Sequence, residues 1–412
     1  MATNFLSLGP RVAIDGVLSR AALAAHAATY RSLLYLCPDQ DGDNGVEEGG
    51  TFADAHAAFG GNAVQVPFFG SKLPAAPFEK GSAEETRRLV GALSLYSSIS
   101  DALDKLDGPI IITCKSARRA GLAWKSVDFI QNHLDEDVES AIEEAKVQGL
   151  TFVESPAMVL WFKTVVDWFR RAPKGPALSV RQLFEKTSST YTYLVFDEIS
   201  KECIIIDPVL ETAERDAKLI TELGLTCKLA LNTHVHADHI TGTGKLKSLL
   251  TPSPPSAIAA VSKAAADVQL GDYSVFEFGR GRRQVIALST PGHTEGCLTY
   301  VIFESARSRP ALVFTGDALL IRGCGRTDFQ GGSAETLYDS VHSRLFTLPG
   351  STIVYPAHNY EGVPFSTIDE ERRLNPRLTK GKAEFCKIMD ELGLPRPAKM
   401  DDAVPANLKC GL

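Results

Sequence analysis

Residues 233–239 read Thr233-His234-Val235-His236-Ala237-Asp238-His239, so three imidazoles and one carboxylate lie within a single short stretch. The run before it, Lys228-Leu229-Ala230-Leu231-Asn232, is short, apolar and bounded by polar residues, which predicts a buried strand that delivers the loop to a sheet edge. Neutral imidazoles and carboxylates together are ligands for zinc or iron. The stretch therefore predicts a metal site at the carboxyl end of a strand.

Three further segments, each after a strand-like run, supply a residue that can bind a metal. They are the tight turn Thr290-Pro291-Gly292-His293-Thr294 and the run ends Phe314-Thr315-Gly316-Asp317 and Tyr355-Pro356-Ala357-His358. A single residue such as His293, Asp317 or His358 is more often a hydrogen-bonded structural residue than a ligand. Together with the loop over 233–239, however, the three support the prediction of a metal site. In order and in local sequence, H-x-H-x-D-H followed by His, Asp and His resembles the metallo-β-lactamase superfamily. The resemblance implies an αββα sandwich.

Composition limits the class of protein and its partners. The 412 residues exceed one ordinary core, which predicts two or three domains. Charged residues make up 23%, the net charge is -7 and no block of basic residues occurs, which argues against nucleic acid and anionic membrane surfaces as partners. Apolar stretches fall far short of a membrane span. The eight cysteines are scattered without C-x-x-C, so we expect free thiols in a reducing compartment, the cytoplasm or the mitochondrial matrix.

The first third of the chain predicts an α/β domain over residues 1–134. Strand-like runs at 31–36, 63–68 and 109–113 alternate with a helix over 84–106, and such alternation favours a parallel sheet. Residues 135–172 predict helices, and Ala172-Pro173-Lys174-Gly175-Pro176 is a break. We therefore expect a helical connector and linker over 135–176 and a second domain over 177–412. That domain should open with strands over 179–195 and 203–208 and a helix over 211–223.

A thiol lies where the third predicted strand ends, in Cys114-Lys115-Ser116-Ala117-Arg118-Arg119. Backbone N–H groups and the helix dipole favour its thiolate, and Arg119 adds a positive charge. The stretch resembles the loops of dual-specificity-phosphatase-like and rhodanese-like domains. Four residues separate Cys114 from Arg119, which is closer to the sulfurtransferase loop, and Ala117 stands where such loops usually carry glycine. A buried structural cysteine, or a sulfur- or phosphate-binding module without catalysis, remains an alternative.

The segment from Gly316 to Gln330 indicates which reaction of the superfamily the chain catalyses. Its residues Gly323-Cys324-Gly325-Arg326-Thr327-Asp328-Phe329-Gln330 resemble the persulfide dioxygenase family, whereas glyoxalase II usually carries an aromatic residue and an acid after the Gly-Arg pair. The likeness continues through 374–378 and 404–407, and covers about 180–412. It implies a mononuclear Fe(II) held by His234, His293 and Asp317, which oxidises glutathione persulfide with O2 to sulfite and glutathione in sulfide catabolism. Such a ligand set leaves positions open for a substrate sulfur and O2.

The resemblance also implies roles for the other candidate site residues, as substrate contacts or as groups that orient the ligands. Arg326 would pair with a carboxylate of the glutathione-derived substrate, and Tyr360 would donate its hydroxyl nearby or serve in packing. The other candidates would orient the ligands by hydrogen bonds or be latent ligands: His236, Asp238, His239 and His358. The alternative is a thioester hydrolase like glyoxalase II that uses the whole set to hold two zinc ions. Sequence alone leaves this alternative open, as it does a homodimer.

Overall fold

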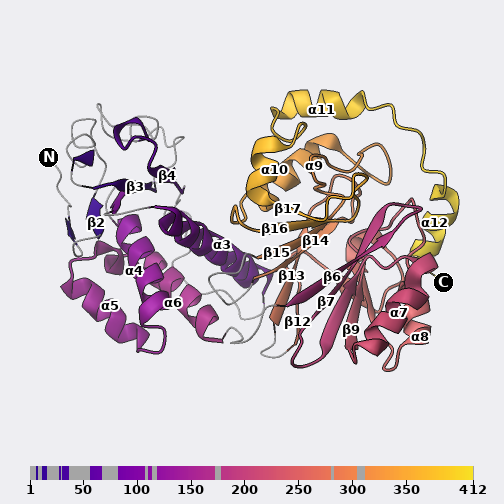
Figure 1. Ribbon diagram of the computed structural model, residues 1–412, viewed down its shortest axis with the longest axis horizontal. Coiled ribbons are helices and arrows are strands. Elements are labelled where there is room, and N and C mark those ends of the chain that lie inside the picture. Colours follow the sequence, from indigo (N-terminus) through magenta and orange to yellow (C-terminus); the bar gives the residue numbers. More distant parts are fainter. Residues whose placement is uncertain are drawn as a thin grey trace. The chain divides into compact units, whose positions relative to one another are not determined.

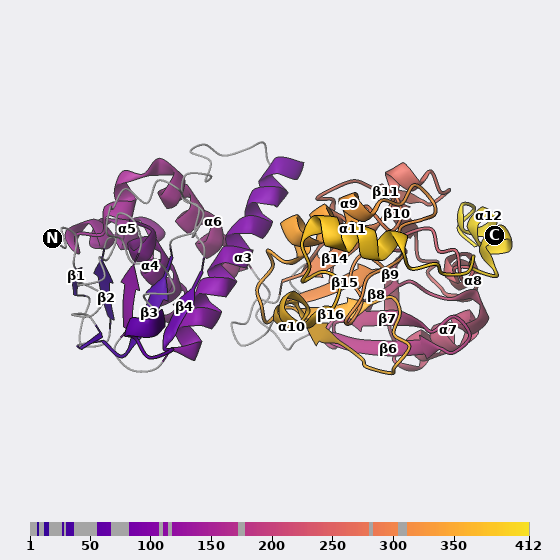
Figure 2. The ribbon, with the colours of Figure 1, turned by 90° about the horizontal axis from the view of Figure 1, so that it is seen from above.

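The computed structural model describes residues 6–7, 12–15, 27–28, 30–36, 56–66, 82–106, 110–113, 118–171, 178–279, 283–303 and 311–411. The chain divides into two compact units, Met1–Arg171 and Ala172–Leu412, which can be followed by colour in Figures 1 and 2. Within the described ranges no helix has the length and apolar character that a membrane span requires.

The first unit contains a five-stranded sheet in the order β1-β2-β5-β3-β4. Its strands are β1 (Leu6–Ser7), β2 (Val12–Asp15), β3 (Ser32–Tyr35), β4 (Ala63–Gln65) and β5 (Ile110–Thr113). Among the described strands of this sheet, the β1–β2 pair is antiparallel and the other pairs are parallel. Leu33, Leu34 and Ile112 are fully buried, as expected for a sheet covered on both faces. The predicted parallel α/β sheet is confirmed, while its phosphatase-like or rhodanese-like character stays a prediction.

Helices pack together beside this sheet. They are α3 (Ala83–Lys105), α4 (Arg118–Asn132), α5 (Val138–Val147), the 3-10 helix η2 (Thr151–Glu154) and α6 (Pro156–Arg171). The Ser82 hydroxyl caps α3 by accepting a hydrogen bond from the Glu85 N–H at 3.1 Å. Helix α6 packs on α3 and α4 through ring contacts. Helices α5 and α6 therefore lie within the first unit, and not in the separate connector that we expected over 135–176, because their apolar faces find partners there.

The second unit is a sandwich of two six-stranded sheets. The first sheet has the order β11-β10-β9-β8-β7-β6, and its strands are β6 (Ser179–Glu185), β7 (Thr190–Phe196), β8 (Glu202–Ile206), β9 (Thr226–Leu231), β10 (Ser256–Ala259) and β11 (Val268–Leu270). The second runs from β12 to β17 in order: β12 (Val275–Phe278), β13 (Arg283–Ser289), β14 (Leu298–Ile302), β15 (Leu312–Gly316), β16 (Ile353–Pro356) and β17 (Ser366–Thr367). The stretch 179–195, which we expected as one strand, is a hairpin of β6 and β7.

The core of the sandwich lies between the inner faces of the two sheets. Alternate residues of β7 and β8 meet those of β13 to β15, with Tyr193 against Phe314 at 5.2 Å between ring centroids. The 3-10 helix η3 (Leu210–Thr212) leads into α7 (Ala213–Glu222), and α8 (Thr243–Leu249) packs beside α7. The remaining helices are α9 (Ala334–Ser340), the π-helical turn η5 (Val341–Leu345), α10 (Ile368–Leu374), α11 (Lys382–Asp390) and α12 (Met400–Asn407). Figure 1 shows α9 to α11 together on the side of the second sheet. The αββα sandwich that we expected is confirmed.

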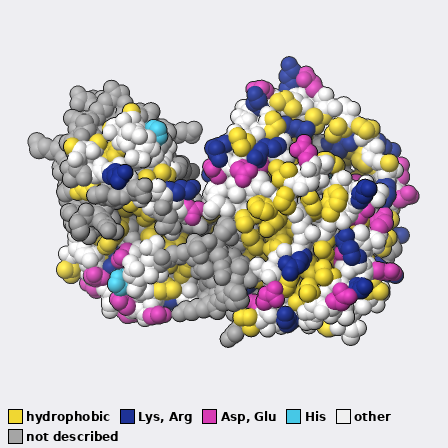
Figure 3. Space-filling model, viewed as in Figure 1, with side chains coloured by type: hydrophobic (Ala, Val, Ile, Leu, Met, Phe, Trp, Pro, Cys, Tyr) yellow, Lys and Arg dark blue, Asp and Glu magenta, His cyan; other side chains and the backbone are white. Residues whose placement is uncertain are grey.

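Strand ends in both sheets point toward one region of the sandwich. Strands β8 and β9 run parallel in the first sheet, and β15 and β16 run parallel in the second. Parallel neighbours present their carboxyl ends at the same edge, so the residues that follow them are brought close together. On the face of the second unit seen in Figure 3, charges of both signs are interspersed with apolar side chains.

Candidate metal centre

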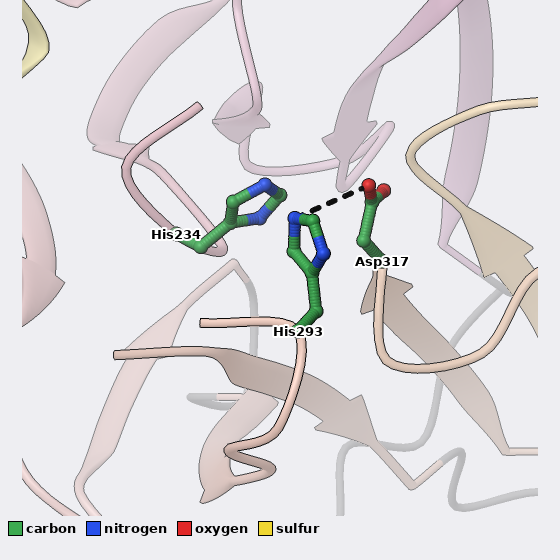
Figure 4. Close-up of side chains that lie close together, drawn as sticks. All are labelled: His234, His293 and Asp317. Carbon is green, nitrogen blue, oxygen red and sulfur yellow. Dashed lines mark ion pairs between the residues drawn. The ribbon is translucent and has the colours of Figure 1, made fainter. Parts of the chain in front are cut away.

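Three side chains from three separate strand ends converge in the second unit. His234 follows β9, His293 follows β13 and Asp317 follows β15. One ligand atom from each lies within 4.8 Å of the others. Figure 4 shows the two imidazoles and the carboxylate directed toward one another, with His293 Nε2 at 3.5 Å from Asp317 Oδ2. All three are largely shielded from solvent. The arrangement offers two nitrogen ligands and one oxygen ligand to a single cation.

Hydrogen bonds determine which nitrogen of each imidazole carries the proton. His293 Nδ1 lies 2.6 Å from the Arg326 carbonyl, which can only accept, so Nδ1 donates and Nε2 keeps its lone pair. The Thr233 hydroxyl donates to Asp207 Oδ2 at 2.8 Å, and it therefore accepts from His234 Nδ1 at 3.0 Å. Both imidazoles are held as the tautomer with a bare Nε2. A metal ligand needs this form.

A second group, His236, Asp238 and His239, lies in the same loop and could also hold a cation. His236 Nε2 lies 3.0 Å from Asp207 Oδ1, and His239 Nδ1 lies 3.0 Å from Asp238 Oδ2. Across the described residues, His236 Nδ1, His239 Nε2 and Asp317 Oδ1 are buried without a hydrogen-bond partner. Buried polar atoms are rarely left unpaired, so these three atoms fit a site that takes a cation.

His358 joins the two groups from the end of β16. Its Nε2 lies 3.6 Å from both Asp238 Oδ2 and Asp317 Oδ1. The Ser189 carbonyl lies 3.3 Å from its Nδ1, and the Thr190 hydroxyl lies at 3.4 Å. The structure therefore brings all seven predicted metal-site residues into one cluster.

Burial and neighbouring charges set the protonation states that a metal requires. Burial, followed by the nearby His236 and His293, lowers the pKa of His234 well below its ordinary value, which favours a neutral imidazole. Burial alone would raise the pKa of Asp238, but His358 and His239 outweigh burial and hold the pKa well below the usual range. A neutral imidazole and an ionised carboxylate are the forms that bind a metal.

Two glycines allow the ligand loops to approach one another. A Cβ at Gly325 would lie 2.8 Å from both Asp317 Cβ and His293 Nδ1, so a side chain there would displace two proposed ligands. Gly316 has φ +53°, and a Cβ there would lie 2.7 Å from Thr233 Cβ. The sequence shows these glycines, but only the tertiary structure shows what each one touches.

Sequence reasoning missed Asp207, which follows β8. Its carboxylate accepts hydrogen bonds from the Thr233 N–H at 2.7 Å and the Thr233 hydroxyl at 2.8 Å, and it pairs with His236. The signal was present, because Ile206-Asp207-Pro208 also ends an apolar run in a carboxylate. Thr190, Gln330 and Asn407 were not predicted as site residues either, although Gln330 and Asn407 lie in the segments that carry the family resemblance.

The guanidinium of Arg326 already has partners. Its Nε and Nη2 donate to the two oxygens of Asp328, each at 2.7 Å, and it also donates to the carbonyls of Pro395 and Leu394. It lies 4.4 Å from the ring centroid of Phe329. A substrate carboxylate at Arg326 would therefore compete with Asp328.

The other predicted site residues lie in different surroundings. Tyr360 is 76% exposed, and its ring stacks parallel to that of His358 with centroids 6.2 Å apart. Cys114 lies outside the described residues, together with 115–117. Arg119 is half-buried in the first turn of α4.

The part of the chain that carries this site is similar in sequence and in structure to known proteins. Residues 186–254 and 247–358 match the metallo-beta-lactamase superfamily. The chain is 54% identical over 243 residues to the mitochondrial persulfide dioxygenase ETHE1 of Mus musculus, which corresponds to 59% of this chain and 92% of the mouse protein. The solved structure of ETHE1 from Myxococcus xanthus is 46% identical with a TM-score of 0.53, and the match covers 57% of this chain and 100% of that one.

A further relative matches nearly the whole chain. It is the beta-lactamase hydrolase-like protein of Xylella fastidiosa strain 9a5c, which is 27% identical over 421 residues, 93% of this chain and 88% of that protein.

Proposed function

Since the chain belongs to the persulfide dioxygenase family, being 54% identical to the mouse enzyme over 92% of that protein, we propose that it oxidises glutathione persulfide with O2 to sulfite and glutathione. It is an enzyme of the persulfide dioxygenase kind. The observation that carries the proposal is the convergence of His234, His293 and Asp317 in a chain of this family. The metal, the second substrate and the residue roles below are parts of the same proposal.

The proposed cofactor is one Fe(II) bound by His234, His293 and Asp317. Two imidazoles with bare Nε2 atoms and one carboxylate make the ligand set of non-haem Fe(II) oxygenases, which keeps positions open for substrate and O2. The orphaned, buried Asp317 Oδ1 supports the presence of a cation. When bound, Fe(II) supplies the redox chemistry between O2 and the terminal sulfur of the substrate.

The protein's own groups position the ligands and set the charge of the site. The Arg326 carbonyl and the Thr233 hydroxyl accept from the two Nδ1 atoms and so fix the orientation of the imidazoles. His236, Asp238, His239 and His358 are proposed to orient the neighbouring groups by hydrogen bonds and to serve as latent ligands. The burial of His236, His239 and His358 excludes water from one side of the site.

Arg326 and Tyr360 are the proposed substrate contacts. A guanidinium holds a carboxylate bidentately, as Arg326 already holds Asp328, and a carboxylate of glutathione could replace Asp328 in that geometry. Tyr360 presents an exposed hydroxyl beside His358.

The alternative, a glyoxalase II-like hydrolase with two zinc ions, is not favoured, because the relatives at 54% and 55% identity are persulfide dioxygenases. The test uses purified full-length protein with glutathione persulfide in an oxygen electrode, with sulfite and bound metals measured in parallel. We expect O2 uptake, sulfite and about one iron per chain. Thioester hydrolysis without O2 uptake, in a chain with two zinc ions, would overturn the proposal.

Compartment and assembly also stay proposals. The mammalian relatives are named mitochondrial, and we propose a reducing compartment for this chain, the mitochondrial matrix or the cytoplasm. Light scattering of the purified protein would test for a homodimer.

A further inference from the structure

The C-terminal segment, residues 400–411, packs against the loop that carries His234. Helix α12 lies near α8 in both ribbon views (Figures 1 and 2). Val404 packs on a small buried cluster that includes Val235, the residue between His234 and His236. Gly411 has φ +78°, and a Cβ there would lie 2.2 Å from the Thr241 carbonyl oxygen. This segment therefore lies in close contact with the loop over 233–241.

Asn407, the last residue of α12, makes three hydrogen bonds to this loop. Its Oδ1 accepts from the Thr241 N–H at 2.7 Å. Its Nδ2 donates to the His236 carbonyl and to the His239 carbonyl, each at 2.8 Å. The amide is 4% exposed and both of its N–H groups are used, so its orientation is unambiguous. One side chain therefore sets the spacing between two loop carbonyls and an amide N–H.

The loop needs such partners because it has no regular secondary structure. Buried backbone groups must find hydrogen bonds, and an irregular loop cannot supply them internally. The Thr233 N–H is bound by Asp207 Oδ1, and the Val235 carbonyl accepts from Gln330 Nε2 at 2.9 Å. Asn407 holds the other end of the loop, from His236 to Thr241. Two side-chain amides from distant parts of the chain thus bind three loop carbonyls.

We propose that Asn407 is a positioning residue that holds the loop over 233–241 in its metal-binding conformation before the metal arrives. The inference rests on the proposed function, because it takes His234 as a ligand. A loop held in advance loses less conformational freedom when the metal binds. Loss of the Asn407 amide should therefore weaken metal binding, although Asn407 itself touches no ligand side chain in the hydrogen bonds described.

The test compares the full-length wild type with Asn407→Asp and Asn407→Ala. Asparagine and aspartate have nearly the same shape, but the carboxylate would face two carbonyl oxygens with no N–H to donate. Gln269→Glu is the matched control, because Gln269 Nε2 also donates to two backbone carbonyls, those of Ala264 and Ala266, outside the loop. The readouts are the thermal midpoint of the metal-free protein, hydrogen exchange at the Thr241 amide, and anaerobic Fe(II) affinity against a competing chelator.

We expect both Asn407 variants, measured while folded, to bind Fe(II) about tenfold more weakly than the wild type. Exchange at Thr241 should be faster in the same variants, and Gln269→Glu should keep wild-type affinity. If one of the two Asn407 variants does not fold, the other one alone serves for the test. Wild-type affinity in a folded Asn407 variant would overturn the inference alone. A wild type that binds no Fe(II) would overturn the proposed function, and this inference with it.

Discussion

At the scale of single residues, the proposed histidine ligands differ from His236 in which ring nitrogen remains free to bind a metal. His234 and His293 use Nδ1 for a hydrogen bond and keep Nε2 for a metal, whereas His236 uses Nε2 to pair with Asp207. We therefore expect His234→Ala, His293→Ala and Asp317→Ala each to abolish iron binding, while His236→Ala retains part of it. The measurement is the amount of iron bound per chain in each variant, determined by elemental analysis. If His236→Ala loses iron as completely as His234→Ala, the mononuclear assignment is wrong.

Gly325 is a residue at which one added carbon should affect the metal. The Cβ of Gly325→Ala would lie 2.7 Å from the Asp317 carbonyl oxygen and 2.8 Å from His293 Nδ1, so Asp317 and His293 must move. We expect iron affinity to fall by about tenfold or more. The control is Gly381→Ala, because in the described part of the chain no heavy atom other than those of Gly381 and its two chain neighbours lies within 4 Å of the added carbon. Equal iron affinity in the two variants would contradict this prediction.

Arg326 has two candidate roles that kinetics can separate. If it holds a substrate carboxylate, Arg326→Lys should raise the apparent KM more than it lowers kcat, because a point charge loses the bidentate geometry. Asp328→Asn should then leave KM unchanged or lower, since the internal competitor for the guanidinium is weakened. We expect this pair of results. An unchanged KM in both variants, together with a lower Tm, would assign Arg326 to holding the segment of Leu394 and Pro395 instead.

At the scale of elements, hydrogen bonds in the turn between β6 and β7 connect the Glu185 carboxylate to the histidines of the candidate metal centre. Glu185 accepts hydrogen bonds from the N–H groups of Thr187 and Ser188 and from the Ser188 hydroxyl. The Ser188 hydroxyl therefore accepts from Thr190 at 2.7 Å, and Thr190 in turn can only accept from His239 and His358. The hairpin thus supports the same tautomer in both histidines, with Nδ1 protonated and Nε2 bare.

The same turn predicts a pH dependence of stability. Burial alone would raise the pKa of Glu185, but the hydrogen bonds from Ser188 and Thr187 outweigh it and lower the pKa from 4.5 to about 2. A lowered folded-state pKa stabilises the protein above pH 4.5, and this contribution is lost as the pH falls toward 2. Glu185→Gln should cost about 1–3 kcal/mol of unfolding free energy at pH 7.

The measurement is denaturant unfolding of the wild type, Glu185→Gln and the surface control Glu222→Gln. By pH 3.5 the advantage of the wild type over Glu185→Gln should have shrunk by about 1 kcal/mol, because the unfolded glutamate is then largely protonated. Glu222 forms an exposed pair with Lys218 at 3.7 Å, so its variant should stay close to the wild type at neutral pH. A difference for Glu185→Gln that does not change with pH would exclude the ionised carboxylate as the cause.

At the scale of the whole molecule, the proposed oxidation belongs to the second unit, which has its own core and contains all the proposed ligands. We expect a fragment of residues 172–412 to bind iron and to oxidise glutathione persulfide with a kcat/KM within about threefold of the full chain. Cys114→Ser in the full chain should leave this kcat/KM unchanged. Loss of activity in the soluble, folded fragment would show that the first unit contributes to the reaction.

The first unit carries a separate hypothesis, that Cys114 accepts a sulfane sulfur. Its test is the intact mass of the full chain after incubation with thiosulfate, with Cys114→Ser as the control. A gain of one sulfur that depends on Cys114 would support a sulfurtransferase-like loop. An unmodified thiol would leave only a structural role for this loop.

The sequence by itself determined the fold of the second unit and the members of its cluster. Apolar runs with a ligand at their carboxyl end, such as the one before His234 and the one before Asp317, are local signals, because a strand's length and polarity are properties of neighbouring residues. Their order along the chain was enough to indicate the superfamily, and the segment from Gly316 to Gln330 indicated the family. The lengths of α3 and β5 were likewise predicted to within a residue or two.

Only the tertiary structure decided which groups hold the ligands in place. Asn407 contacts the loop from 166 to 171 residues away, and Thr190 reaches His358 across 168 residues, so no local pattern could reveal either contact. The contacts of Arg326 with Leu394 and Pro395, and the assignment of α5 and α6 to the first unit, were hidden for the same reason. Hydrophobic periodicity indicates that a face is buried, but which partner buries it, and which hydrogen bonds follow, depends on packing between segments distant in sequence.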